Sequence, residues 1–321
     1  MMNYTVYQNG KEVNGELPFD LMRTEAAGIF ETMRAYGGRI LHEEEHLSRL
    51  SESAKTVGYR PFPGLAELRL ELRAALKAFN RKECYIRLTL WEGCSFAILS
   101  SREHPKELYE KGVVLKTASF PRGGPNTFPW QAKVSAYQQA ILASTEPHPD
   151  KIYEWIFLDL GGVLSETRIG NFFIVQYRSR HPGSVKKGGA ILLTPPEHLI
   201  LNGVTRRFVI KCARELGMQV REAPLTRHEF FNADEAFLCN TSWEVLPVRE
   251  LDGRMIGTGK PGPVTLKLHH FFKRRIQQDV TPRRSPRTHQ RLRLNRSYSF
   301  CQNPAQTRRG DPLHRRYLES P

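Results

Sequence analysis

The sequence contains no apolar run of about 18 residues, the length that a membrane-spanning helix needs. Its first ten residues, MMNYTVYQNG, lack the basic start and apolar core of a secretory signal. Cysteine is scarce, and the five cysteines at positions 84, 94, 212, 239 and 301 show no paired spacing. These absences argue against a membrane span and a disulfide framework, so we expect reduced thiols in a cytoplasmic protein.

The chain also lacks the G-x-x-x-x-G-K-[ST] order of a nucleotide-binding loop. The stretch GTGKPG at 257–262 places a lysine among glycines, but this arrangement is typical of a loop after a hairpin. We therefore predict no nucleotide-binding loop of that kind.

Positive charge is abundant but unevenly distributed. The net charge of +15 is typical of a nucleic-acid-binding protein. Residues 273–321, however, carry 13 Lys and Arg against 3 Asp and Glu, a net charge of +10, whereas residues 1–272 carry only +5. The sequence thus predicts a mildly basic body with a basic tail. We expect the tail to be disordered, because its Arg, Pro and Ser residues bury too little apolar surface to offset ordering entropy.

The chain is long enough for two domains, because it has 321 residues of which 40% are hydrophobic. The stretch PRGGPNTFP at 121–129 is rich in proline and glycine, so it is the predicted linker. Strand and helix patterns mix on both sides of it, which predicts an α/β or α+β fold. The predicted division is a small N-terminal domain 1–120, the linker 121–129, a larger domain 130–272 and the tail 273–321.

Local patterns predict several individual elements. Apolar residues recur at helical spacing from Leu47 to Val57, and Gly58 suits the end of that helix. Tight turns are expected at Asn9-Gly10 between two strands and at Asp252-Gly253 within a hairpin. Further helices are expected at 65–80, 133–144, 203–217 and 265–276.

The segment HEEEH at 42–46 matches the H-E-x-x-H pattern of zinc proteases. On a helix, His42 and His46 would share a face and Glu43 could act as the base. The other interpretation is a charged helix start, with acidic residues favouring the helix dipole. The Gly-Gly turn just before His42 and the lack of a third ligand at a suitable spacing favour the charged helix start.

The stretch WQAKVSAYQQAILA at 130–143 sets one amine, Lys133, four residues before one phenol, Tyr137. The ordinary interpretation is a helix-start lysine whose stem covers apolar surface. The alternative is a lysine that desolvation makes nucleophilic at neutral pH, so that it can form a Schiff base. A pyridoxal cofactor would also need a carboxylate at its ring nitrogen, a donor near its phenolic oxygen and donors for its phosphate.

Six blocks of sequence offer such groups in a fixed order. Together these blocks resemble the fold-type IV pyridoxal-phosphate enzymes, the class IV aminotransferase family, from about residue 4 to about residue 272. That family includes branched-chain and D-amino-acid aminotransferases and aminodeoxychorismate lyase. The blocks are GIFETMRAYGGRI…HEEEHLSRLSESA, YIRLTLWEG, AKVSAYQQAILA, GGVLSETRIGNFFIV, LTPPEHLILNGVTRRFVIKCARELG and ADEAFLCNTSWEVLPVRELDGRMIG.

The resemblance implies a site for pyridoxal 5′-phosphate between two domains. By position, Lys133 matches the catalytic lysine that forms the Schiff base, Tyr137 the tyrosine that hydrogen-bonds the phenolic oxygen, and Glu166 the glutamate that pairs with the ring nitrogen. Phosphate binding is implied for Arg49, Val204, Thr205 and Thr241. The positions implied on the substrate side are Phe30, Tyr85, Arg87 and Ser242.

The sequence departs from the family pattern mainly on the substrate side. Glu25 and Ala26 stand where the family usually has an aromatic residue followed by glycine. Gly170 replaces a small hydroxyl residue, and Asn240 replaces a glycine. Because the cofactor positions are intact, the resemblance indicates the cofactor rather than one particular substrate.

The resemblance implies an aminotransferase that moves an amino group from an amino acid to a 2-oxo acid. FETMRAY and the YIR strand favour the branched-chain type. The implied partners are these small molecules and a second copy of the chain in a homodimer, and neither a metal nor a membrane is expected. A 4-amino-4-deoxychorismate lyase, which uses the same cofactor groups, stays open as an alternative. Nucleic-acid binding through residues 273–321 is a more distant one.

Overall fold

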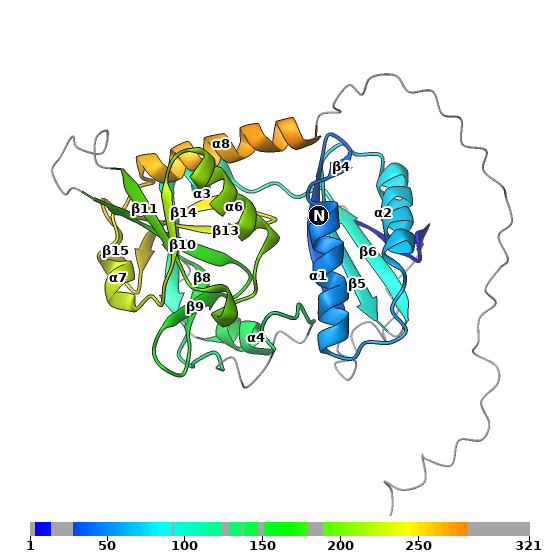
Figure 1. The fold of residues 1–321 in the computed structure, drawn as a ribbon, viewed down its shortest axis with the longest axis horizontal. Coiled ribbons are helices and arrows are strands. Elements are labelled where there is room, and N and C mark those ends of the chain that lie inside the picture. The colour runs from blue at the N-terminus through cyan, green and yellow to red at the C-terminus, as the bar shows by residue number, and fades with distance from the viewer. Residues whose placement is uncertain are drawn as a thin grey trace, which may run out of the picture. The chain divides into compact units, whose positions relative to one another are not determined.

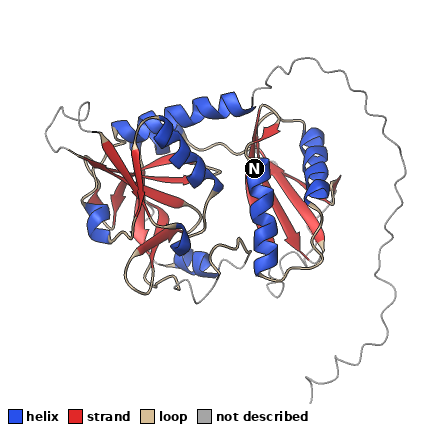
Figure 2. Cartoon of the chain, viewed as in Figure 1, coloured by secondary structure: helices blue, strands red, loops and turns tan. Residues whose placement is uncertain are grey.

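Two β-sheets with helices packed against them organise the protein in this computed structural model (Figure 1). The structure describes residues 4–13, 28–91, 93–123, 129–135, 138–146, 151–178 and 189–280. All of them belong to one compact unit, residues 1–282. Helices and strands mix along the chain (Figure 2), so the predicted mixed α/β class is confirmed. Within the described residues, no helix is long and apolar enough to cross a membrane.

The first sheet is antiparallel and has six strands in the order β2-β1-β6-β5-β3-β4. The predicted Asn9-Gly10 turn joins β1 to β2, and both of its residues have positive φ, 47° and 74°. Asparagine and glycine tolerate that backbone conformation better than other residues, which explains the turn. The strands are Tyr4–Gln8 (β1), Lys11–Glu12 (β2), Ile29–Tyr36 (β3), Arg39–Ile40 (β4), Cys84–Trp91 (β5) and Cys94–Ser100 (β6).

Alternation along β3 divides its side chains between the two faces of this sheet. Ile29, Met33 and Ala35 join one apolar core with α1 (Glu43–Thr56) and α2 (Leu65–Phe79). The even-numbered residues of β3 point to the opposite face. The helices therefore cover one face of the sheet, and the other face is available for a functional site.

The second sheet has nine strands in the order β12-β11-β10-β13-β14-β7-β8-β9, and β15 pairs with β14. It is mixed, since β7 runs parallel to both β14 and β8, and β11 runs parallel to β12. The strands are Val113–Thr117 (β7), Ile152–Leu158 (β8), Leu164–Thr167 (β9), Asn171–Tyr177 (β10), Ala190–Thr194 (β11), Gln219–Glu222 (β12), Glu235–Asn240 (β13), Glu244–Leu251 (β14) and Arg254–Met255 (β15).

Two helices, α6 (Val204–Glu215) and α8 (Pro263–Val280), pack against one face of the second sheet. The ring of Phe208 on α6 lies 4.9 Å from that of Phe272 on α8, measured between ring centroids. The other face packs against α7, where Phe230 contacts Phe172. The shorter helices are α3 (Lys106–Lys111), α4 (Gln138–Thr145), the 3-10 turn η2 (Glu197–Leu199) and α7 (Arg227–Phe231).

The prediction of a helix over 133–144 is wrong at its start. Helix α4 begins at Gln138, and Lys133 lies ahead of it in an extended segment. The backbone of this segment pairs with the start of β3, because Phe30 donates its N–H to the Lys133 carbonyl at 3.1 Å and Val134 bridges Ile29. Pairing with a strand that is distant in sequence thus overrides the local helical pattern.

The end of the body also differs from the expectation. Helix α8 continues beyond residue 272 to Val280, and both Ile276 and Val280 are buried. The first residues of the basic segment 273–321 therefore belong to the folded core. The rest of the predicted tail, from residue 281, and the phenol of Tyr137 lie outside the described residues.

Candidate active site

Side chains on the helix-free face of the first sheet line a cavity of about 380 Å³. Phe30 and Thr32 of β3 point into it, and the register places Thr32 directly opposite Arg87 of β5. The Arg87 guanidinium lies over the Phe30 ring, 4.0 Å from its centroid. The second sheet and α6 complete the walls.

Every described residue that the sequence singled out for the site lines this one cavity. They come from segments up to 212 positions apart, so only the fold brings them together. A larger groove of about 970 Å³ elsewhere in the described residues, between the end of α2 and the end of α8, contains none of them. The residues that meet are Phe30, Arg49, Tyr85, Arg87, Lys133, Glu166, Val204, Thr205, Thr241 and Ser242.

Arg49 on α1 is held by a buried carboxylate that sequence reasoning missed. Its Nε and Nη2 donate to the two carboxylate oxygens of Glu31, each at 2.7 Å, and its Nη1 donates to the Asn202 carbonyl at 3.1 Å. Glu31 is 0% exposed and also contacts His46 Nδ1 at 2.7 Å. Burial opposes its ionisation, but Arg49 and His46 outweigh burial and hold the pKa of Glu31 at about 2. A fixed, charged guanidinium therefore stands at the cavity wall.

The two histidines of HEEEH have separate surroundings. His46 faces Glu31, whereas the ring of His42 packs edge-on against Phe208 and its Nδ1 lies 3.3 Å from Glu45. His42 precedes α1 with a φ of 52°, as expected for a residue outside the helix. Among the residues that the structure describes, no group of three potential ligands could hold a metal ion.

The N-terminus of α6 supplies anion-binding groups opposite Arg49. The first N–H groups of a helix have no partner inside it, and the residue before α6, Gly203, offers no side-chain cap. These amides lie beside the hydroxyls of Thr205 and Thr241, whose oxygens are 3.3 Å apart. Together with Arg49, this donor set suits a phosphate group, because helix N-termini and guanidinium groups both stabilise anions.

Gly203 is required for close packing at this point. A Cβ atom there would come within 2.3 Å of Asn171 Oδ1. Asn171 uses its amide to donate to Glu166 Oε2 at 3.2 Å and to the Leu201 carbonyl at 3.0 Å. The glycine thus allows one asparagine to connect the site glutamate with the loop before α6.

Glu166 stands at the cavity wall and has three partners. Its Oε2 accepts from the Leu201 N–H at 3.0 Å as well as from Asn171, and its Oε1 lies 2.5 Å from Arg122 Nη1. Burial nevertheless raises the pKa of Glu166, although Arg122 and the Leu201 amide act in the opposite direction. The result is a carboxylate that is both fixed and relatively basic, which suits a partner for a protonated ring nitrogen.

Sequence reasoning missed Arg122, although it makes the shortest contact to Glu166. It is buried and its guanidinium lies 4.1 Å from the centroid of the Trp130 ring. Its position in the Pro- and Gly-rich stretch 121–129 suggested a linker rather than a site. Glu31, Arg102 and Arg168 were missed as well; the latter two also line the cavity.

Lys133 presents its amine to the same space. The Nζ atom lies 4.6 Å from the centroid of the Phe30 ring, and the backbone N–H donates to Ser53 Oγ on α1 at 2.9 Å. Its carbonyl is tied to β3. Contacts to α1 and β3 thus fix the backbone of the lysine, while its side chain reaches the cavity.

Two departures from the family pattern have a structural reason. Gly170 passes so close to the neighbouring strand that a Cβ there would lie 3.0 Å from the Cys239 carbonyl and 3.1 Å from the Trp243 ring. Asn240 uses its Oδ1 to accept the N–H groups of Ser242, at 2.9 Å, and Trp243, at 2.7 Å. The asparagine therefore builds the turn that lines the cavity, and the bulky Trp243 accounts for the glycine.

We expect the Arg49–Glu31 pair to be essential for both folding and anion binding. Arg49→Leu alone should destabilise the protein by about 3–5 kcal/mol, because it leaves a buried carboxylate unpaired. Adding Glu31→Gln should restore much of the stability but not the affinity for pyridoxal phosphate. Urea unfolding and cofactor titration of the two variants separate these effects. If the double variant binds the cofactor as tightly as the natural protein, Arg49 does not contact the phosphate.

The same cluster should make the protein sensitive to acid. The pKa of Glu31 is about 2 in the folded protein and higher in the unfolded chain, so the stabilisation is complete above pH 5 and is lost as the pH falls toward 2. Between pH 5 and pH 3 this carboxylate alone should cost about 2 kcal/mol of unfolding free energy. The pH dependence of unfolding should be shallower by that amount in Glu31→Gln. Parallel curves would contradict the assignment.

Comparisons with known proteins agree with this geometry. A family model described as amino-transferase class IV matches residues 28–251. The branched-chain-amino-acid aminotransferase of Escherichia coli strain K12 is 32% identical over 266 residues, which cover 76% of this chain and 82% of the relative.

Solved structures of a branched-chain amino acid aminotransferase from the organism abbreviated T.th. are similar in fold as well. The one with pyridoxamine 5′-phosphate has a TM-score of 0.74 at 27% identity and covers 86% of this chain and 94% of its own. The complex with N-(5′-phosphopyridoxyl)-L-glutamate has a TM-score of 0.73 at 28% identity, with the same coverage of 86% and 94%. The resemblance inferred from the sequence is confirmed, and the chain belongs to the class IV aminotransferase family.

Proposed function

We propose that the protein is a pyridoxal-phosphate-dependent aminotransferase that uses branched-chain amino acids as amino donors. The observation that carries the proposal is the single cavity in which an amine, a buried carboxylate and an anion-binding helix N-terminus meet. The relatives named above are branched-chain aminotransferases, and one related structure contains the cofactor in its amine form. The cofactor is therefore pyridoxal 5′-phosphate, as expected from the sequence.

The chain's own groups fit this cofactor. Its phosphate would be held by Arg49, by the hydroxyls of Thr205 and Thr241, and by the first amides of α6, including that of Val204. Its ring nitrogen would be held by Glu166, and its aldehyde carbon would be bonded to Lys133. When bound, the cofactor supplies an electron sink for the charge that develops at the substrate Cα.

Lys133 then serves as the acid and base of the reaction. Its amine, once released by the incoming substrate, takes the proton from the substrate Cα and returns it on the other side of the transferred nitrogen. Glu166 keeps a proton on the ring nitrogen, because a basic carboxylate with three partners stays in place. The walls exclude bulk water from these proton transfers to the extent that the substrate fills the cavity.

The substrate side combines an aromatic surface with positive charge. Phe30 and Tyr85 offer apolar surface for a branched side chain, and Arg87 offers a guanidinium for a carboxylate. Ser242 lies at the turn between β13 and β14. The combination suits a donor with an apolar side chain and an acceptor such as 2-oxoglutarate, and the related complex with a glutamate adduct supports the acceptor.

A panel of donors and acceptors tests the proposal. Purified protein, cofactor, 2-oxoglutarate and L-leucine, L-isoleucine or L-valine should form glutamate, whereas D-amino acids should not. Pyruvate released from 4-amino-4-deoxychorismate, with no glutamate formed in the panel, would instead support the lyase alternative.

We also propose a homodimer in the cytoplasm, as expected from the family resemblance. The four cysteines that the structure describes are unpaired, which agrees with a reducing compartment. The division into two domains stays a proposal too. Because β7 belongs to the second sheet, we favour a boundary between β6 and β7 rather than at 121–129. Ultracentrifugation and limited proteolysis test these two points.

The basic segment after Val280 should be dispensable for transamination, because all described site residues precede it. We expect a chain ending at Pro282 to retain cofactor binding and turnover and to elute earlier from a cation-exchange resin. A chain ending at Phe271 is the contrasting variant, and it should lose stability because it removes Phe272, Ile276 and Val280 from the core. Loss of cofactor binding in the longer truncated chain would show that the basic segment supports the site.

A further inference from the structure

The turn between β13 and β14 is fixed by contacts from three other elements. Besides the two hydrogen bonds within the turn, Arg34 Nη1 on β3 donates to the Ser242 carbonyl at 3.4 Å. His104, just before α3, places its Nε2 2.9 Å from Ser242 Oγ, and the Tyr109 hydroxyl on α3 donates to the Trp243 carbonyl at 3.0 Å. Since Ser242 lines the cavity, these contacts set the position of a cavity wall.

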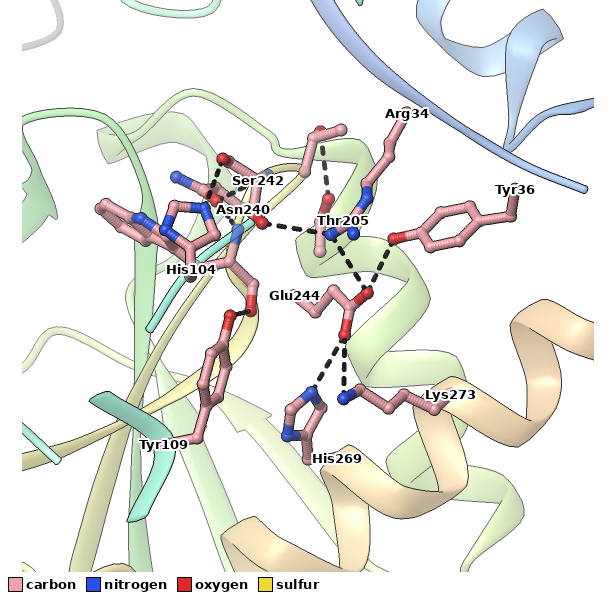
Figure 3. A network of polar contacts seen from close by, with 12 residues as sticks. Arg34, Tyr36, His104, Tyr109, Thr205, Asn240, Ser242, Glu244, His269 and Lys273 are labelled. Atoms are coloured by element: carbon pink, nitrogen blue, oxygen red, sulfur yellow. Dashed lines mark hydrogen bonds and ion pairs between the residues drawn. The ribbon is translucent and has the colours of Figure 1, made fainter. Parts of the chain in front are cut away.

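Glu244, two residues further along, collects the polar groups beneath this turn (Figure 3). One carboxylate oxygen accepts from the Tyr36 hydroxyl at 2.8 Å and from Arg34 Nη1 at 3.4 Å. The other lies 3.0 Å from His269 Nε2 and 3.9 Å from Lys273 Nζ, both on α8. Glu244 thus connects β3 of the first sheet with the second sheet and with the last helix.

The backbone and charge of Glu244 both depend on these contacts. Its φ of 63° lies in the left-handed region, which is costly for a residue other than glycine and persists only where the surroundings enforce it. The side chain is buried. Burial opposes its ionisation, but His269, Arg34 and Tyr36 outweigh burial and lower the pKa of the carboxyl. A charged carboxylate therefore holds an unfavourable turn in place.

We propose that Glu244 is a positioning residue for substrate, acting through Arg34 and the turn at Ser242. The proposal rests on the proposed aminotransferase function. Glu244 and Ser242 share Arg34 as a partner, so a change at the carboxylate moves the guanidinium that contacts the Ser242 carbonyl. Thr241, by contrast, has a separate contact to Thr205 at the start of α6. Loss of the Glu244 charge should consequently displace the substrate wall more than the phosphate cradle.

The test is Glu244→Gln, which keeps the size of the side chain and removes its charge. We expect KM for the amino donor to rise about tenfold, the effect of one hydrogen bond to a charged group. Both kcat and cofactor affinity should stay within about twofold. Glu250→Gln is the matched control, because Glu250 lies on the same strand and pairs at the surface with Lys151 at 2.8 Å. It should change none of the three quantities.

Amide hydrogen exchange of the protein without cofactor gives a readout that does not need activity. The peptide covering residues 240–244 should exchange at least about tenfold faster in Glu244→Gln than in the natural protein, whereas the first turn of α6 should not change. Unchanged exchange in the turn, or a fall in cofactor affinity as large as the rise in KM, would overturn the proposal. A natural protein without transaminase activity would refute the proposed function, and exchange would still test the positioning of the turn.

Should Glu244→Gln fail to fold, His269→Gln replaces it. This change alters one partner on the α8 side of the carboxylate and leaves the turn sequence intact. The same pattern, a raised KM with kcat and cofactor affinity preserved, is expected at a smaller size. An unaltered KM together with an unaltered turn would count against Glu244 as a positioning residue.

Discussion

Lys133→Ala is expected to lose nearly all transaminase activity and the covalent link to the cofactor. The amine of Lys133 is the one described amine that lines the cavity, at 4.6 Å from the Phe30 ring centroid. If it moves the proton at the substrate Cα, its loss should lower kcat by at least about 10²–10⁴-fold, the usual contribution of a positioned acid or base. Borohydride reduction followed by denaturation should leave cofactor attached to the natural protein but not to the variant.

Two controls make the result specific to the amine. Lys133→Arg keeps a cation in the cavity but offers no nucleophile, so it should be as inactive as the alanine variant. Lys151→Ala removes a surface lysine that pairs with Glu250, and it should remain fully active. A small primary amine added to Lys133→Ala should restore part of the proton transfer. Substantial activity in both Lys133 variants would show that another group performs the chemistry.

Much of the fold could be predicted because local signals agree with the tertiary structure. Gly58 ends α1 with a φ of 67°, and Asn9-Gly10 makes the first hairpin turn, since these residues tolerate positive φ. The start of α6 was predicted within one residue. The segment around Lys133 was not, because its conformation depends on pairing with Ile29, which lies about a hundred positions earlier.

The site was predicted in part for the same reason. Motif resemblance located the groups that would touch the cofactor, but not the residues that hold those groups. Glu31 is an ordinary strand residue in sequence, and its importance comes from two ion-pair partners on α1. Arg122 lies in a stretch whose prolines and glycines suggest a linker. Glu244 has a positive φ without being glycine or asparagine, so no turn signal marks it.

Glu166→Gln is expected to bind the cofactor but to slow proton removal from the substrate Cα by about 10²-fold, the loss seen when one fixed electrostatic partner is removed. An amide cannot stabilise a positive charge on the ring nitrogen as a carboxylate does. Because Arg122 and Asn171 would remain in place, the variant should keep its fold. Single-turnover reactions with a Cα-deuterated donor should show an isotope effect that is larger than in the natural protein.

Arg122 provides the opposite change at the same carboxylate. Its guanidinium, 2.5 Å from Glu166 Oε1, makes the carboxylate less basic, and burial makes it more basic. Arg122→Met should therefore raise the pKa of Glu166 further and shift the acidic limb of the pH–rate profile upward, whereas Glu166→Gln should remove that limb. The ring of Trp130 can still pack against the methionine, so the shift can be measured in a folded protein. A pH profile identical in both variants and the natural protein would mean that Glu166 is not the residue that controls the ring nitrogen.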